Sequence, residues 1–305
     1  MPWTCAFLAI FLCLTVPLSS RASSPEIPPT HDRQFWRDIA KNKYAVPDKQ
    51  SAFALAQELS SYFASPDPEL RDELAYSILD VWIVYRNHLS TPELLSLLDQ
   101  WQDNLRSGIG ETSTDSVLKR SFSALSLAAL AERDLKSPFF AEDRFRALLD
   151  RTLAYLKDER DLRGFDPTKG WIHATAHTAD LLAFLAANPL LELQDQSRIL
   201  LGVSERLSSA HQIFSYGEQD RLANVISTIV ARKDFDAAAF HLWLTRLNEL
   251  DRKVWNDTPP NDNLLKTYQN NSYMLQALAV RLYVLPKTPA VTAELDEVTQ
   301  ILRKR

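Results

Sequence analysis

Three polar side chains interrupt an otherwise apolar segment, at a spacing that suits either metal binding or a buried polar network. His173, His177 and Asp180 lie four and then three residues apart. On a helix this spacing places all three on one face. The surrounding residues are mostly Ile, Ala, Leu and Phe. We therefore expect a helix over 171–188 that is buried on nearly all sides, with a polar stripe that finds partners or lines a cavity.

Two chemical interpretations of this stripe remain open. Two histidines one turn apart can converge on a metal ion, and Asp180 could complete the ligand set, giving a divalent zinc or manganese site in a hydrolase. The general-base glutamate of the His-Glu-x-x-His motif is absent, because residues 174–176 are Ala, Thr and Ala. In the other interpretation, His173, His177 and Asp180 form a closed network with Arg163 or a neighbouring helix.

A second polar cluster opens a later helix and offers further candidate ligands. Glu218 and Arg221 are one turn apart, and Asp220 lies between them. The carboxylates could join a metal site if this helix end packs near His173. Alternatively, they are acidic residues that the helix dipole favours in any first turn.

The elements that must position these residues are expected to be helices. Glycine is scarce, at 6 of 305 residues, which is too few for the turns of a sheet-rich fold. Apolar residues instead recur at helical spacing, as in Leu74, Ile78, Leu79, Trp82 and Tyr85. Similar segments occur at about 49–64, 114–133, 141–157, 171–188, 193–213, 219–232, 235–251, 263–284 and 290–303.

Successive helices joined by short polar turns pack most simply as antiparallel pairs, and stacked pairs form a solenoid. The fold prediction is therefore a single all-α domain of the HEAT or armadillo type over residues 49–305. Residues 23–48 are polar and Pro-rich at their start. We expect them to form a linker that becomes helical near 33–40.

The first 22 residues are typical of a secretory signal peptide. Residues 5–18 form an uncharged apolar run of 14 residues, short of the roughly 20 that span a bilayer. Ser20 and Ala22 are the small residues before the expected cut. We therefore predict a protein exported to the periplasm or the medium, with no transmembrane helix in the mature chain. Both cysteines lie in the removed segment, so no disulfide is expected.

Charge and composition argue against two further functions. Without residues 1–22 the chain has 33 basic and 39 acidic residues, and its only basic run is the terminal RKR. This balance gives no reason to expect nucleic-acid binding. A nucleophilic enzyme is also disfavoured, because the mature chain has no cysteine and no Gly-x-Ser-x-Gly motif.

Four segments resemble motifs of a bacterial family of uncharacterised proteins, domain of unknown function 2785. They are VLKRSFSALSL at 117–127, DLRG and GWIHATAHTADLL within 161–182, GEQDRLA at 217–223 and NNSYMLQAL at 270–278. The resemblance extends over most of residues 70–285 and implies an all-helical bacterial protein, but no activity. The residues that it places in or beside the family signature are Trp171, His173, His177, Asp180, Arg120, Glu218, Asp220 and Arg221.

Two functions of different classes follow from these observations. In the first, the protein is an exported helical scaffold whose concave face or core pocket binds a peptide, a glycan or an envelope partner. In the second, it is a metal-dependent hydrolase that uses His173, His177 and Asp180, with Glu218 or Asp220 as possible further ligands.

Overall fold

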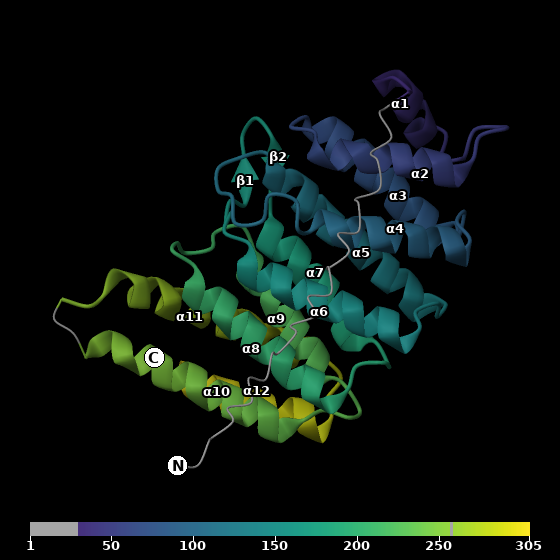
Figure 1. The fold of residues 1–305 in the computed structure, drawn as a ribbon. Coiled ribbons are helices and arrows are strands. Elements are labelled where there is room, and N and C mark those ends of the chain that lie inside the picture. Colours follow the sequence, from purple (N-terminus) through teal and green to yellow (C-terminus); the bar gives the residue numbers. More distant parts are fainter. Residues whose placement is uncertain (1–29, 257–258) are drawn as a thin grey trace, which may run out of the picture.

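The computed structural model describes residues 30–256 and 259–305, and within them the chain is a stack of helices (Figure 1). The predicted signal peptide, residues 1–22, lies outside the described residues. The α-helices are α1 (Arg33–Lys41), α2 (Ala52–Ser61), α3 (Ser77–Asp80), α4 (Thr91–Asn104), α5 (Ser116–Lys136), α6 (Glu142–Asp158), α7 (Ala174–Ala187), α8 (Leu193–Ser209), α9 (Glu218–Val230), α10 (Ala237–Arg252), α11 (Asp262–Val284) and α12 (Pro289–Leu302). The short 3₁₀ and π segments are η1 (Tyr62–Ala64), η2 (Glu69–Tyr76), η3 (Val81–Tyr85) and η4 (Lys253–Trp255).

The helices form two layers that follow the order of the chain. One layer holds α5, α7, α9 and α11, each packed against the next. The other holds α6, α8 and α10, which pack in the same sequence. Figure 1 shows the stack running from α1 and α2 at the top to α10 and α12 at the bottom. Because each helix contacts mainly its neighbours in order, the prediction of an all-α, solenoid-like domain is confirmed.

The hydrophobic core lies between these layers and continues to the N-terminal end of the described chain. Trp36, Trp82 and Trp101 are fully buried in it. Trp36 belongs to α1, which agrees with the helix expected near 33–40 at the end of the predicted linker. Residues 30–48 therefore belong to the folded domain, because α1 adds an amphipathic helix whose buried face seals one end of the core.

Residues 69–85 form one continuous helical segment that is mostly π-helical. The segments η2 and η3 are π-helices, and the four residues of α3 join them. A π turn holds more residues than an α turn, so the apolar stripe drifts around the axis. Leu74, Ile78 and Trp82 are buried as expected. Tyr85, predicted on the same apolar face, is 63% exposed, because the wider turns rotate it away from the core.

A small β-hairpin replaces the predicted start of the helix at 171. Strands β1 (Phe165–Asp166) and β2 (Gly170–Trp171) pair in antiparallel fashion. Gly170 turns the chain with a φ of 70°, a conformation that glycine adopts without steric cost. The helix α7 then begins at Ala174, three residues later than predicted. It is buried on most sides, as the sequence predicted.

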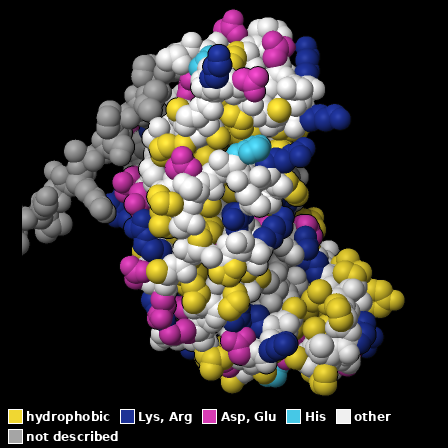
Figure 2. Space-filling view, turned by 90° about the vertical axis from the view of Figure 1, so that its right-hand side faces the viewer, with side chains coloured by type: hydrophobic (Ala, Val, Ile, Leu, Met, Phe, Trp, Pro, Cys, Tyr) yellow, Lys and Arg dark blue, Asp and Glu magenta, His cyan; other side chains and the backbone are white. Residues whose placement is uncertain are grey.

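The outer surface mixes both signs of charge. On the face shown in Figure 2, Lys and Arg side chains alternate with Asp and Glu side chains, and apolar side chains gather near the lower right. Among the described residues, none of the helices combines the length and the hydropathy that a membrane span requires.

Candidate functional site

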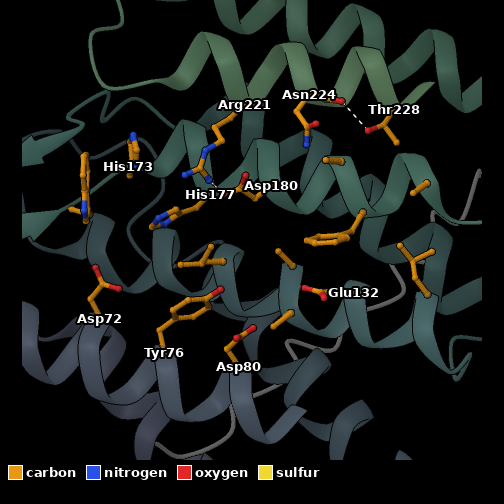
Figure 3. A pocket seen from close by; sticks show the side chains of 18 of the residues that line it. Asp72, Tyr76, Asp80, Glu132, His173, His177, Asp180, Arg221, Asn224 and Thr228 are labelled. Atoms are coloured by element: carbon orange, nitrogen blue, oxygen red, sulfur yellow. Dashed lines mark hydrogen bonds and ion pairs between the residues drawn. The ribbon is translucent and has the colours of Figure 1, made fainter. Parts of the chain in front are cut away.

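A cavity of about 790 Å³ opens between four neighbouring helical segments. Its walls come from the 69–85 segment, α5, α7 and α9, and Figure 3 shows polar side chains pointing into it from opposite sides. This volume is typical of ligand-binding cavities. The predicted site residues that line it are Trp171, His173, His177, Asp180 and Arg221.

His173 reaches the cavity from the residue just before α7. Its backbone is left-handed, with a φ of 52°, a rare conformation for a residue with a side chain. The ring stacks on Trp171 with centroids 4.7 Å apart, and its Nε2 lies 3.0 Å from the carbonyl oxygen of Tyr216. A carbonyl only accepts, so Nε2 must carry the proton and donate. Burial lowers the pKa of His173 to about 4, so the ring is neutral at pH 7.

Two glycines place Tyr216 against this histidine. A Cβ on Gly164 would collide with the Tyr216 ring, so the glycine permits their close approach. Gly217 follows with a φ of 89° and caps α9. The backbone N–H of Tyr216 donates to Glu218 at 2.9 Å. These contacts fix the carbonyl that accepts from His173, and the Tyr216 side chain lines the cavity.

His177 presents an unprotonated ring nitrogen. Ser121 has one hydroxyl proton, which it donates to the carbonyl of Ile172. The hydroxyl oxygen must therefore accept from Nδ1 of His177, 2.9 Å away. Burial, together with nearby His173 and Arg221, lowers the pKa of His177 well below its ordinary value, so the ring is neutral and its Nε2 carries a lone pair. Among the described residues none hydrogen-bonds to Nε2, so this nitrogen remains available as an acceptor at the cavity.

The carboxylate of Asp180 forms an ion pair with a neighbouring helix and is not a free acceptor. Its Oδ2 accepts from Nη1 of Arg221, which extends from α9 toward α7 (Figure 3). Burial nevertheless raises the pKa of the Asp180 carboxyl, and the guanidinium opposes this shift. The predicted partner Arg163 does not take part, since it binds Asp161 instead. The closed network proposed for the stripe thus forms in part, but with a different arginine.

The opposite wall carries acidic residues that the sequence analysis did not select. Asp72, Tyr76 and Asp80 project from the 69–85 segment, and Glu132 projects from α5 (Figure 3). Burial, together with Glu132, raises the pKa of Asp80 to about 6. Burial also raises the pKa of Asp72. The sequence signal that could have identified this wall is the four-residue spacing of Asp72, Tyr76 and Asp80 on a helix whose other face is apolar.

These carboxylates differ in their partners. Glu132 pairs with Lys136 at 2.7 Å, and the Lys136 ammonium also lies 4.6 Å from the centre of the Tyr85 ring. Within the described part of the chain, Asp72 and Asp80 have no ion-pair partner. The cavity therefore has an excess of negative charge on this wall.

Three other predicted residues lie away from the cavity. Arg120 is fully buried and binds Glu159 with two hydrogen bonds, of 2.6 and 3.0 Å. Glu218 is buried and lies behind His173, with its Oε1 3.8 Å from the ring Nε2. Asp220 is exposed and pairs with Arg281 of α11. The cluster at the start of α9 thus contributes only Arg221 to the cavity wall.

The metal hypothesis stays a prediction, and the geometry defines what it would require. His173 uses Nε2 as a donor to Tyr216, and Asp180 is occupied by Arg221. Binding an ion at His173, His177 and Asp180 would therefore require both of these contacts to open. The open acceptor is the Nε2 of His177.

Chemically, the cavity wall carries both hydrogen-bond acceptors and donors. Its open acceptors are the carboxylates of Asp72 and Asp80 and the His177 nitrogen. One N–H of the Arg221 guanidinium donates to Asp180, and the Thr228 hydroxyl donates to the carbonyl of Asn224. Tyr76, Trp171 and Tyr216 bring further donor groups to the lining. The carboxylates of Asp72 and Asp80 match a ligand with N–H groups.

The fold and this cavity define an all-α, solenoid-like protein with a polar, ligand-sized site across four helical segments. The family model described as "Protein of unknown function (DUF2785)" matches residues 105–280. The chain belongs to this family, and the resemblance noted in the sequence is confirmed. The wall that carries Asp72 and Asp80 precedes the matched residues. No curated protein and no solved structure matches the chain.

Proposed function

We propose that this protein is an exported helical scaffold whose cavity binds a peptide through a basic side chain. The observation that carries the proposal is the pair of unpartnered carboxylates, Asp72 and Asp80, which face the lone pair of His177 across the cavity. A guanidinium or ammonium group supplies both the positive charge and the several N–H donors that these acceptors match.

The raised pKa values of this wall support a cationic ligand. Burial and the neighbouring Glu132 destabilise the ionised carboxylate and raise the pKa of Asp80 to about 6, although Lys136 partly opposes this shift. A bound cation would stabilise the ionised form and lower that pKa again. Asp72 would respond in the same direction, because its pKa is also raised by burial.

The aromatic rim supports the same ligand class. Trp171, Tyr85 and Tyr216 line the cavity and are 40%, 63% and 48% exposed. Aromatic faces attract cations and pack on the aliphatic part of a basic side chain. Lys136 already makes such a contact with Tyr85 and Glu132, which illustrates the chemistry that the rim favours.

The closed contacts of the other wall favour a scaffold over a metal-dependent hydrolase. Asp180 with Arg221 and His173 with Tyr216 are complete pairs, whereas a catalytic metal site needs converging ligands and an open position. Export to the periplasm or medium remains part of the proposal and is supported by residues 1–22 of the sequence.

Calorimetric titration with capped tripeptides tests the proposal. We expect Ala-Arg-Ala to bind at least about tenfold more tightly than Ala-Glu-Ala, and more weakly as salt is raised. Asp80→Asn should weaken Ala-Arg-Ala binding by about tenfold, since it removes one charge pair. Asp150→Asn is the matched control, because Asp150 lies on α6 and pairs with Arg198 at the surface.

Three results would overturn the proposal. One is equal affinity for the basic and acidic peptides. Another is binding of a neutral glycan such as chitotriose without binding of the basic peptide. The third is stoichiometric zinc or manganese in the purified protein that is lost in His177→Ala, which would favour the hydrolase.

A further inference from the structure

A second polar cluster, separate from the cavity, joins helices α10 and α12. His241 lies on α10, and Glu294 and Glu297 lie one turn apart on α12. The Nε2 atom of His241 is 3.0 Å from an oxygen of each glutamate. Among the described residues, this is the one group of three histidine, cysteine or acidic side chains whose ligand atoms all lie within 4.8 Å of one another.

The cluster contains more negative charge than its single proton donor can balance. Glu294 is buried, with an exposed fraction of 2%. The charged groups that act on it are His241 and Glu297, and the second of these is itself negative. One ring N–H therefore serves three oxygen contacts, at 3.0, 3.2 and 3.0 Å. A buried carboxylate with so little compensation calls for a cation.

Two of the separations within the cluster also suit a metal ion. In a tetrahedral zinc site with bonds of about 2.0–2.1 Å, neighbouring ligand atoms are about 3.3 Å apart. The separations of 3.0 Å between Nε2 and the two carboxylate oxygens need only a small adjustment to reach that value. His241 is half exposed, which leaves a path for the ion and a position for water.

We propose that His241, Glu294 and Glu297 bind a zinc ion that fastens α12 to α10. The imidazole supplies the lone pair of Nε2, and for this the ring carries its proton on Nδ1. The two carboxylates supply one oxygen each and neutralise the ion. α12 otherwise packs mainly on α11, so the ion adds a direct link from the last helix to the other layer of the stack.

Titration of the full chain with zinc chloride tests this site. We expect one equivalent to bind with a micromolar or lower Kd, to raise the Tm and to slow amide exchange in α12. His241→Ala and Glu297→Gln should each weaken binding at least about tenfold. Both residues are partly exposed, so these variants should fold. His211→Ala, which removes another exposed histidine, is the control.

The same titration contains the results that would overturn the proposal. Absence of binding, or binding that survives both His241→Ala and Glu297→Gln, would exclude this cluster. Binding that is lost in His177→Ala but kept in His241→Ala would instead place the zinc in the cavity. Because the peptide titration uses no metal, failure of one proposal leaves the other intact.

Discussion

Arg120 and Glu132 lie on the same helix, α5, about three turns apart, yet they belong to opposite kinds of polar region. Arg120 is enclosed by Glu159 and by the carbonyl oxygens of Ser107 and Gly108. Glu132 faces the cavity beside Asp80, and although Glu132 pairs with Lys136, Asp80 has no ion-pair partner among the described residues. The first region is closed and matched in charge, and the second is open and unmatched.

The comparison separates charged residues that stabilise the fold from charged residues that are available to a ligand. A matched buried pair makes no demand on a ligand, and its loss leaves an uncompensated charge inside the protein. An unmatched carboxylate lowers the stability of the empty protein, but it gains a partner when a cation binds. We therefore expect the closed region to govern folding and the open region to govern ligand binding.

The largest effect should come from opening the closed region. Arg120→Met should lower the free energy of unfolding by about 3–5 kcal/mol, because it leaves Glu159 buried without its cation. Urea denaturation followed by circular dichroism measures this. Arg144→Met, which breaks a surface pair with Asp99, should change stability by less than about 1 kcal/mol. Similar losses for the two variants would erase the distinction between the regions.

An intermediate effect concerns the pH dependence of the cavity wall. Folding lowers the pKa of His173 to about 4 from 6.5, so the unfolded chain binds more protons between these values. Stability should therefore fall as pH falls through this window, by about 2 kcal/mol from pH 7 to 5 for His173 alone. The pKa of His177 shifts in the same direction.

The variant His173→Gln isolates this contribution, because its amide can still donate to the Tyr216 carbonyl. Its stability should decline less steeply between pH 7 and 5 than that of the wild type. His211→Gln, at an exposed position, should keep the wild-type slope. Parallel profiles for His173→Gln and the wild type would show that His173 titrates alike in the folded and unfolded states.

The smallest effect should have the opposite sign. Folding raises the pKa of Asp80 to about 6 from 3.8, so its contribution to stability is present at low pH and is lost as pH rises through 6. After allowance for solvent screening, Asp80→Asn should stabilise the protein by about 1 kcal/mol at pH 7. Near pH 3.5 the same substitution should change the stability little. Thermal unfolding at the two pH values measures this effect. A variant that is less stable than the wild type at pH 7 would contradict the idea of an unmatched wall.

The sequence allowed the helices and one wall of the site to be predicted, for local reasons. Helical periodicity survives in α5, α7, α9 and α11 because each buries a stripe against its neighbours. The spacing of His173, His177 and Asp180 placed them together, and all three do line the cavity. The left-handed backbone of His173 was missed, because the hairpin that imposes it depends on residues before the helix.

The other wall could not be predicted from the local pattern. Asp72 and Asp80 look like the solvated face of an ordinary amphipathic helix until α7 and α9 are placed opposite them. In the same way, the resemblance put Arg120 beside the site residues, whereas the structure pairs it with Glu159, 39 residues away. A polar residue on a helix gives no indication of which distant side chain it will meet.

The sequence by itself determined the fold class, the family and the residues that share the α7 face, because periodicity and short motifs are properties of neighbouring residues. Only the tertiary structure decided which polar groups are matched and which are left open. The proton on Ser121 fixes the His177 tautomer through Ile172, and Arg221 closes Asp180 from another helix. Hydrogen bonding and charge compensation depend on atoms a few ångströms apart in space, and the stacking of helices brings those atoms together from distant parts of the chain.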